Sequence, residues 1–408
     1  MTTYRFATNL AKSEYDAFVQ SSPLCNLLQS YNWAAVKSNW DHLHCGLYKN
    51  DTLCATALVL IKALPFGFTM MYIPRGPILD YDDPEVIKQF FDGLKKIGRS
   101  HKTLFIKMDP GIEIGKYPSS DTSRPRNGNE KYVQPLENAG AIFQGYSMKI
   151  EEAIQARFHS ILDKPEDVLA AMPKKTRKLI KEAEKRHLQI VSGRHELLDD
   201  FAAMVEMTEE RKHVSLRNKE YFKKLLDNYG DDAIIMLAVC DPAKIRQECQ
   251  ARYDALEEQI AALPENQKKK RFTLEEQKES AAKDIRIIEE LIETVGDDKA
   301  RPIAGVLSVK YGKSAEMLYA GMDERFRRFM PQYKTYVENF QWAFDKGCTE
   351  FSMGGVEGSL DDGLTHFKDN FAPKIHEYIG EFDLPVNRLL YKPSKIAYEK
   401  KRHSLKEA

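Results

Sequence analysis

A stretch of heptad spacing in the middle of the chain limits its fold more than any other feature. Apolar residues recur in steps of three and four over residues 243–263, and again over residues 274–295. This spacing predicts two helices that fold back on each other as an antiparallel coiled coil about 30 Å long. Strand-like apolar runs stand on both sides of it, at residues 234–240 and 303–311. We therefore interpret residues 243–296 as an arm inserted into a domain, not as a linker.

The turn predicted between these two helices, residues 264–273, contains four consecutive cations, Lys268 to Arg271. A basic tip favours an elongated anionic partner such as tRNA. It could equally be the solvated tip of a hairpin that serves dimerisation or scaffolding, and the sequence leaves both interpretations open.

The rest of the chain predicts an α+β fold with more than one core. With 408 residues, the chain exceeds the size that a single hydrophobic core usually supports. Short apolar runs bounded by turn residues alternate with helical periodicity over residues 1–150, and the same theme returns over residues 151–240. Residues 115–130 are rich in Pro, Ser, Gly and Asn and predict a loop.

Charge is balanced over the whole chain but concentrated in two places. Lys and Arg total 61, as do Asp and Glu, so any contact with nucleic acid must come from a local patch. Residues 174–186 carry seven cations, which suit phosphate-rich ligands or an anionic membrane, with an ordinary exposed helix as the alternative. Residues 395–406 are also basic, and would either bring the chain to an anionic membrane or form a solvated tail.

Motifs of several common enzyme classes are missing. The sequence has no P-loop, no Gly-x-Ser-x-Gly elbow, no His-Glu-x-x-His pair and no turn of the kind that wraps coenzyme A pyrophosphate. Its six cysteines form no Cys-x-x-Cys pair, and no apolar run approaches the length of a membrane span. We expect a soluble cytoplasmic protein without metal or cofactor. If it is an enzyme, it must use a donor that is already activated.

Three local features point to chemistry, although each also has a purely structural interpretation. Prolines on both sides of Arg75 fix a rigid turn that points a guanidinium in one direction. Asp109 ends a predicted buried strand, where a carboxylate faces a cleft in many α/β arrangements. Gly354 and Gly355 would let the backbone approach a ligand closely.

Taken together and in this order, segments over nearly the whole chain resemble the Fem family of peptidoglycan branch-forming aminoacyltransferases, most of all its streptococcal MurM and MurN type. Each segment is weak alone, and the combination is specific. The segments that carry the resemblance are residues 28–30, 33–40, 72–81, 109–110, 319–321, 353–357, 367–368 and 378–381.

The resemblance implies two domains, each similar to the GNAT acetyltransferase fold, that face each other across a cleft. The first would be residues 1–150, completed by 384–408, and the second residues 151–383 with the arm at 243–296. The resemblance also implies transfer of an amino acid, alanine or serine for this type, from aminoacyl-tRNA. The acceptor would be the stem-peptide lysine of lipid II or of its precursor, UDP-muramoyl-pentapeptide, and we expect the enzyme to be a monomer.

Four residues of a diphosphate site are implied by the resemblance. Lys37 and Arg217 match two cations that contact the diphosphate of the muropeptide precursor, and a guanidinium offers phosphate a bidentate fork. Ser215 and Tyr221 match neighbours that line this site.

Five further residues are candidates for binding and catalysis. Asp109 and Tyr319 match residues near the acceptor peptide, and Arg75 is a further substrate-binding candidate. Lys368, with Phe367 beside it, matches a lysine near the tRNA 3′ end. The acceptor amine, with a pKa of ~10.4, must lose a proton before attack, so Asp109 is the candidate to orient or deprotonate it. Lys368 is the candidate to stabilise the oxyanion, a contribution of about 3–4 kcal/mol.

Three other interpretations of the whole chain compete with this one. A coenzyme A-dependent acyltransferase would share the GNAT-like fold, but the missing pyrophosphate turn counts against it. A non-catalytic scaffold would assemble through residues 243–295. A tRNA synthetase-like enzyme would need an ATP-binding signature, which the sequence lacks.

Overall fold

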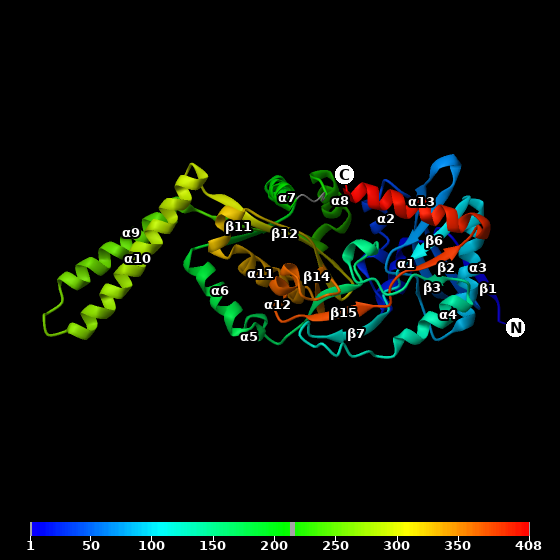
Figure 1. Cartoon of the computed structure of the whole chain (residues 1–408), viewed down its shortest axis with the longest axis horizontal. Helices are drawn as coiled ribbons and strands as arrows, with labels where there is room; N and C mark the ends of the chain where they lie inside the picture. Colours follow the sequence, from blue (N-terminus) through cyan, green and yellow to red (C-terminus); the bar gives the residue numbers. More distant parts are fainter. Residues whose placement is uncertain (1, 213–216, 408) are drawn as a thin grey trace.

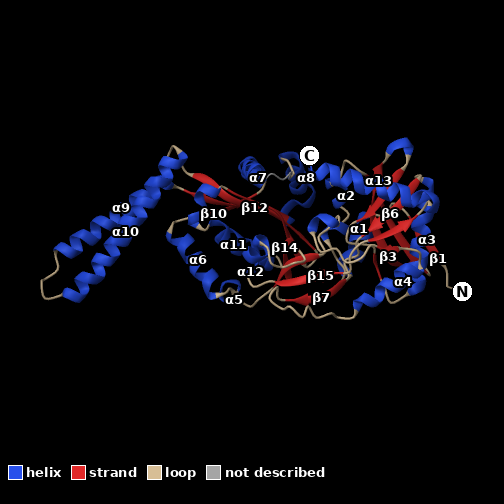
Figure 2. Cartoon of the chain, viewed as in Figure 1, coloured by secondary structure: helices blue, strands red, loops and turns tan. Residues whose placement is uncertain are grey.

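The computed structural model describes residues 2–212 and 217–407. In this part of the chain, the strands form two mixed sheets of eight strands each, with helices packed on them (Figures 1 and 2). A helical hairpin extends from the end of the molecule that lies farthest from the N-terminus (Figure 1). The expected α+β fold is confirmed.

The first sheet has the strand order β1-β2-β3-β4-β6-β16-β8, and β5 also pairs with β3. Its strands are β1 (Tyr4–Ala7), β2 (Asp41–Lys49), β3 (Thr52–Ala63), β4 (Thr69–Ile73), β5 (Ile78–Leu79), β6 (Thr103–Met108), β8 (Ile142–Phe143) and β16 (Phe382–Pro385). The helices of this domain are α1 (Lys12–Ser21), α2 (Trp33–Val36), α3 (Pro84–Ser100), α4 (Val133–Asn138) and α13 (Arg388–Glu407).

The second sheet has the order β10-β11-β12-β13-β14-β9-β15-β7. Its strands are β7 (Glu113–Tyr117), β9 (Phe158–Asp163), β10 (Gln189–Gly193), β11 (Ala233–Cys240), β12 (Arg301–Tyr311), β13 (Ser314–Met322), β14 (Glu350–Val356) and β15 (Lys374–Tyr378). The helices of this domain are α5 (Val168–Ala171), α6 (Lys174–Lys185), α7 (Leu198–Lys212), α8 (Lys219–Tyr229), α11 (Pro331–Asp345) and α12 (Gly363–Asp369), together with the hairpin α9 (Pro242–Ala261) and α10 (Lys268–Val295).

Both sheets contain one parallel pair of strands, and a helix connects the strands of each pair. β4 and β6 run parallel with α3 between them in sequence, and β13 and β14 run parallel with α11 between them. Parallel neighbours need such a crossover. Each crossover helix packs on its own sheet with a buried apolar stripe, which includes Phe90 and Leu94 in α3 and Phe340 and Phe344 in α11. The expectation of two similar α+β domains is therefore confirmed.

The two sheets exchange strands. β7, from the N-terminal part of the chain, pairs with β15 in the second sheet, while β16, from the C-terminal part, pairs with β6 in the first. The prediction of a loop from residue 115 was therefore wrong for residues 115–117, which belong to β7. The ring of Tyr117 is buried at the end of this strand, and the predicted loop can begin only after this residue.

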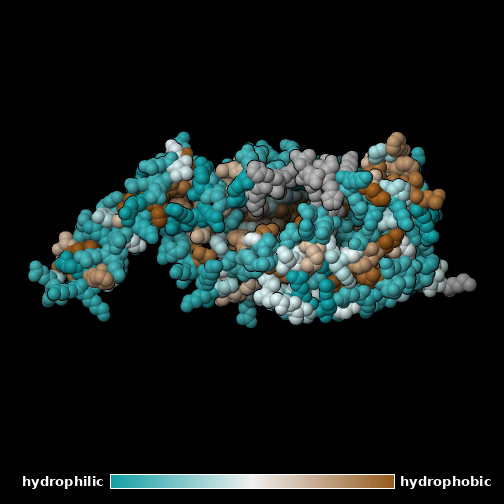
Figure 3. Space-filling view, viewed as in Figure 1, coloured by the Kyte–Doolittle hydropathy of each residue, from teal (hydrophilic) through white to brown (hydrophobic). Residues whose placement is uncertain are grey.

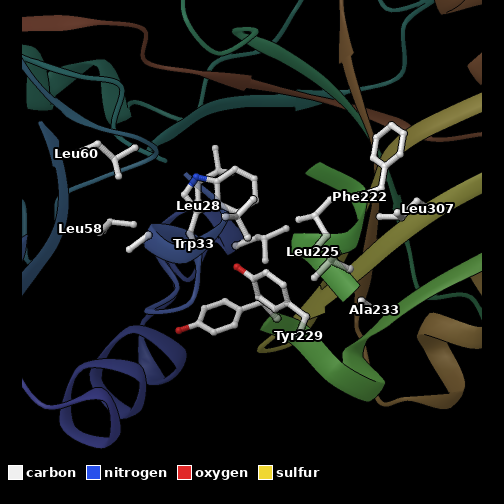
Figure 4. Close-up of a cluster of buried hydrophobic side chains, with 14 of the residues drawn as sticks. Leu28, Trp33, Leu58, Leu60, Phe222, Leu225, Tyr229, Ala233 and Leu307 are labelled. Carbon is white, nitrogen blue, oxygen red and sulfur yellow. The ribbon is translucent and has the colours of Figure 1, made fainter. Parts of the chain in front are cut away.

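A hydrophobic cluster joins the two domains (Figure 4). Leu28 and Trp33 from the first domain belong to the same buried cluster as Leu225 and Tyr229 from α8 of the second. Within the cluster, the hydroxyls of Ser30 and Tyr229 share a hydrogen bond of 2.6 Å. Buried apolar surface and a satisfied polar pair together hold the domains in one arrangement.

The inserted arm is a hairpin formed by α9 and α10. Toward its tip, Leu256, Leu274 and Ala281 are buried between the two helices. At its base, Ile245 and Ile288 join an apolar cluster of the second domain. The arm is therefore anchored to the second domain while its tip extends into solvent (Figure 1).

The α10 helix begins earlier than the spacing of apolar residues predicted. The basic run that starts at Lys268, which we predicted as part of the turn, forms the first turn of this helix. Lys and Arg are good helix formers, so the helix begins before Leu274, its first buried apolar residue. Among the helices of the described residues, none combines the length and the apolar composition that crossing a bilayer requires.

A buried ionic cluster centred on Glu377 holds the exchanged strand β7 in the second sheet. The Glu377 carboxylate pairs with the Arg157 guanidinium and accepts a hydrogen bond from the Tyr117 hydroxyl. Its Oε1 also lies 2.8 Å from a guanidinium nitrogen of Arg126. Both Arg157 and Glu377 are almost completely buried, so each charge depends on the other for compensation.

We predict that Glu377→Ala lowers the free energy of unfolding by about 3–5 kcal/mol, because Arg157 would stay buried without a counter-charge. Urea titration followed by intrinsic fluorescence would measure the loss. Glu257→Ala is the matched control, since Glu257 pairs with Lys278 on the exposed surface of the arm. That substitution should cost about 1 kcal/mol or less. Equal losses in the two variants would contradict a structural role for the buried cluster.

Candidate functional site

Two cavities of similar size lie on opposite sides of a pair of packed tyrosines, Tyr221 and Tyr319. The first, which we call the Lys37 cavity, has a volume of about 780 Å³ and is lined from both domains, by Trp33 and Lys37 from one and by Arg217 and Tyr221 from the other. The second, the Lys368 cavity, has a volume of about 770 Å³ and lies between β13, α11 and α12 of the second domain. Cavities of this size hold small ligands or the ends of larger ones.

Lys37 follows the last residue of α2 and extends between two aromatic rings. Its Nζ lies 5.4 Å from the ring centroid of Trp33 and 5.3 Å from that of Tyr221. The guanidinium carbon of Arg217 lies 5.2 Å from the same Tyr221 centroid. Burial, with a smaller contribution from the nearby charge of Arg217, lowers the pKa of Lys37 to about 8. A bound anion would relieve both effects.

Neither cation has a carboxylate partner within residues 2–212 and 217–407. Glu206 and Glu209 line the same cavity, but no ion pair joins them to Lys37 or Arg217 in the described chain. Two adjacent cations without an internal counter-ion form a site suited to a diphosphate. Ser215, which we predicted for this site, lies outside the described residues.

Tyr319, on β13, connects the two cavities. Its side chain lines the Lys368 cavity, while its ring packs edge-on against Tyr221 at a centroid distance of 6.1 Å. Burial raises the pKa of the Tyr319 hydroxyl, and the charge of Arg217, which lines the Lys37 cavity, opposes this effect. A ligand in one cavity therefore lies one side chain away from a ligand in the other.

Lys368 is fixed in the wall of the second cavity by the short helix α12. Asp362 caps this helix by accepting hydrogen bonds from two backbone N–H groups of its first turn. Lys368 is only 4% exposed, and its Nζ donates to the carbonyls of Gly354, at 3.1 Å, and Gly355, at 2.9 Å. Gly354 has a φ of +82°, which glycine adopts without strain. Phe367 lines the same cavity.

Asp109 lies behind the wall of the Lys37 cavity. Its two carboxylate oxygens accept hydrogen bonds of 2.6 Å from the Tyr72 hydroxyl and from the backbone N–H of Arg75. Burial raises the pKa of Asp109 to about 7, and the Arg75 charge opposes this effect. Tyr72 itself lines the cavity, so Asp109 reaches a ligand there only through the Tyr72 hydroxyl.

Arg75 joins the two domains and lines neither the Lys37 nor the Lys368 cavity. Its guanidinium donates to the Ala156 carbonyl at 2.6 Å and lies 2.9 Å from Nε2 of His159. It also lies 4.2 Å from the ring centroid of Tyr378. The structure thus groups most of the predicted residues around two adjoining cavities but leaves Arg75 in the contact between the sheets.

Two residues of the Lys37 cavity were missed from the sequence. Tyr72 lies in the segment 72–81 that carries the family resemblance, and its hydroxyl donates to Asp109, so its place in that segment was the available signal. Gln155 comes from the second domain and lines the same cavity as Tyr72. Nothing in the sequence around Gln155 marks it.

A third cavity, of about 830 Å³, contains none of the predicted residues. Its walls carry the carboxylates of Glu113, Glu316 and Glu350. Burial raises the pKa of Glu316 to about 7, although the charge of Arg75 opposes this. An acidic wall repels phosphate, so the Lys37 cavity is the better anion site.

Comparisons with known proteins agree over nearly the whole chain. Residues 10–399 match the model of the FemAB family. A lipid II:glycine glycyltransferase of Staphylococcus aureus (strain COL) is 28% identical over 413 residues, which cover 94% of this chain and 93% of that protein. The aminoacyltransferase FemA of Staphylococcus aureus (strain MW2) is 27% identical over 409 residues, which cover 94% of this chain and 96% of that one. The crystal structure of FemX superposes with a TM-score of 0.76 at 25% identity and covers 95% of this chain and 99% of that chain.

The pKa of Lys37 predicts how anion binding depends on pH. A diphosphodiester, whose own charge is constant over this range, should bind about tenfold more weakly at pH 9 than at pH 7, because Lys37 loses its proton near pH 8. Isothermal titration calorimetry at the two pH values would measure the change. Lys37→Arg is the control, since arginine stays charged and should remove the pH dependence. A wild-type affinity that is constant from pH 7 to pH 9 would contradict the assignment.

Proposed function

Since this chain belongs to the FemAB family and is an aminoacyltransferase, we propose that it transfers an amino acid from aminoacyl-tRNA to the stem-peptide lysine of lipid II. The observation that carries this proposal is the pair of adjoining cavities. One holds two cations without a carboxylate partner in the described chain, the other holds a fixed ammonium, and Tyr319 lies between them.

The acceptor would bind in the Lys37 cavity through its diphosphate. Lys37 supplies a point charge and Arg217 a planar fork, and both lie around the ring of Tyr221. Lipid II and UDP-muramoyl-pentapeptide both carry a diphosphate, so this part of the site fits either molecule. We favour lipid II because the name of one relative specifies it.

The donor would place its 3′ end in the Lys368 cavity. The aromatic side chains of Tyr333 and Tyr336 line this cavity and offer a surface on which a base can stack. Lys175 and Arg327 line it too and would attract the phosphates of the tRNA. An aminoacyl ester is already activated, so no covalent enzyme intermediate and no cofactor are needed.

Tyr72 and Asp109 would receive the proton of the attacking amine. The amine has an ordinary pKa of ~10.4 and attacks only after it has lost a proton. Tyr72 lines the cavity and its hydroxyl donates to Asp109, whose raised pKa of about 7 suits a group that takes up a proton near neutral pH. Asp109 would thus act through Tyr72.

Lys368 would stabilise the negative oxygen that forms when the amine attacks the ester. A fixed cation or donor beside such an oxygen contributes about 3–4 kcal/mol to the transition state. The two hydrogen bonds to the glycine carbonyls hold the Lys368 ammonium in place before the substrate arrives. This preorganisation avoids a reorganisation cost during the reaction.

The proposal extends to the transferred amino acid and the setting of the enzyme. We propose alanine or serine as the amino acid, a monomer as the active form, and the cytoplasm, at the membrane surface, as its location. Purified lipid II would be incubated with tRNAs charged separately with alanine, serine and glycine, and the product analysed by mass spectrometry. Transfer from a coenzyme A thioester and from none of the tRNAs would overturn the proposal.

We predict that Lys368→Met and Arg217→Ala affect different kinetic constants. Lys368→Met should lower kcat by about a hundredfold or more with little change in the acceptor KM, because the contact is made in the transition state. Arg217→Ala should raise the acceptor KM by about tenfold or more, because it removes a charged contact present in the bound state. Steady-state kinetics with varied acceptor would measure both.

The matched control for these variants is Lys374→Met, because Lys374 is exposed and lies outside both cavities. It should leave both constants within about twofold of the wild type. Identical kinetic effects of Lys368→Met and Arg217→Ala would contradict the separate roles.

A further inference from the structure

We propose that the tip of the β3–β4 hairpin and the outward side of α13 form a contact surface for a lipid bilayer that contains anionic lipids. We call this surface the Phe66–α13 face. The inference rests on the proposed function, because only a lipid-linked acceptor requires the enzyme to work at a membrane.

The two most exposed large apolar side chains of the described residues lie on this face. Phe66, at the tip of the hairpin, is 95% exposed, and Leu389, at the start of α13, is 90% exposed. Ile396, two turns further along the helix, is 55% exposed. Figure 3 shows apolar surface over the hairpin tip and the beginning of α13, at the upper right. Transfer of such exposed apolar side chains from water into a bilayer lowers the free energy.

The backbone at Phe66 adds to the case. Its φ of 62° and ψ of 23° lie in the left-handed region, where glycine or asparagine is favoured and a bulky ring is rare. No packing within the protein compensates for this conformation, because the ring is in solvent. A partner outside the chain would explain why phenylalanine stands at this position.

The α13 helix has two distinct sides. On the inward side, Tyr391 and Tyr398 pack edge-on against Phe105 at centroid distances of 5.9 and 6.0 Å. On the outward side, Leu389 and Ile396 are seven residues apart, which places them on one stripe of the helix. The inward contacts fix the helix, so its outward apolar stripe is presented to the outside in a fixed orientation.

The hairpin tip and α13 belong to one surface. Leu64 and Phe68, which flank the tip, pack against the same hydrophobic cluster that contains Tyr391. Tyr398 packs against this cluster too. The hairpin tip and α13 therefore rest on the same buried cluster, and Figure 1 shows both along the upper side of the first domain.

Exposed cations surround the apolar side chains. Five of these cations take part in no ion pair within the described residues. They are Arg99, Lys102, Arg388, Lys392 and Lys400. Burial lowers the pKa of Lys95, and the charges of Arg388 and Arg99 lower it as well, so both lie within electrostatic range of Lys95. Lys102 lies at the base of the hairpin, where its carbonyl accepts from the N–H of Thr69. Cations around separate protruding apolar groups suit an anionic bilayer, whereas the core of a protein interface is depleted of lysine.

The position of this face beside the Lys37 cavity fits a lipid-linked acceptor. Tyr398 lines that cavity, and Ile396 lies only two residues before it on the same helix, a rise of about 3 Å. The diphosphate of lipid II is attached directly to its lipid chain, so Lys37 and Arg217 must come close to the headgroup layer. Contact of the Phe66–α13 face with the bilayer would bring the Lys37 cavity close to the headgroup layer.

Vesicle sedimentation with the full chain tests the proposal. The wild type should bind vesicles of phosphatidylglycerol and phosphatidylcholine more tightly than pure phosphatidylcholine vesicles, and added salt should weaken the binding. Phe66→Ser and the double variant Leu389→Ser/Ile396→Ser should each weaken binding by about tenfold. The matched control is Phe272→Ser on the arm, because Phe272 is 62% exposed but lies far from this face. Equal binding by Phe66→Ser and Phe272→Ser would overturn the proposal.

Two further measurements separate this inference from its alternatives. Phe66→Ser should lower transfer to lipid II in vesicles but leave transfer to water-soluble UDP-muramoyl-pentapeptide unchanged, which also shows that the variant folds. If neither acceptor is used but vesicle binding behaves as expected, the proposed function fails and the membrane surface stands. If sedimentation velocity shows that Phe66→Ser converts a dimer into a monomer without changing vesicle binding, the face is a contact between two copies and the proposal is wrong.

Discussion

The anion site exists only because the two domains are packed together in one fixed arrangement. Lys37 belongs to the first domain and Arg217 to the second, and the ring of Tyr221 lies near both charges. Burying Lys37 beside a second cation costs free energy, and burial first and the Arg217 charge second lower the pKa of Lys37. The buried cluster around Trp33 and Tyr229 offsets this cost. A bound dianion would remove the repulsion and strengthen the same domain contact.

Charge is separated within a chain whose formal net charge is zero. The Lys37 cavity carries cations without carboxylate partners in the described chain, and the third cavity carries Glu113, Glu316 and Glu350. Helix α6 adds exposed cations, and Lys175 from this helix lines the Lys368 cavity. An anionic ligand is therefore attracted to two of the three cavities and repelled by the third, which no whole-chain charge would indicate.

The sequence predicted features that depend on local spacing better than features that depend on distant contacts. The heptad spacing predicted the helices of the arm, and the apolar runs predicted most strands. The strand β7 was partly missed because its pairing with β15 involves residues about 260 positions away, as the contact between Tyr117 and Glu377 illustrates. The family resemblance identified Lys37 and Arg217 as candidates, but no pattern in the sequence indicates that both lie near the ring of Tyr221. Likewise, only the structure assigns the Arg75 guanidinium to Ala156 and His159.

The exchange of strands between the sheets also bears on how the chain is made. The first sheet contains β16, so its central strand β6 stays without one neighbour until residues 382–385 have left the ribosome. Contacts of such long sequence separation form slowly, since much chain entropy is lost before they stabilise the fold. An N-terminal fragment would expose an unpaired strand edge, a common starting point for aggregation. Neither sheet can therefore be complete before residues 374–385 have been made, and cotranslational folding cannot proceed one domain at a time.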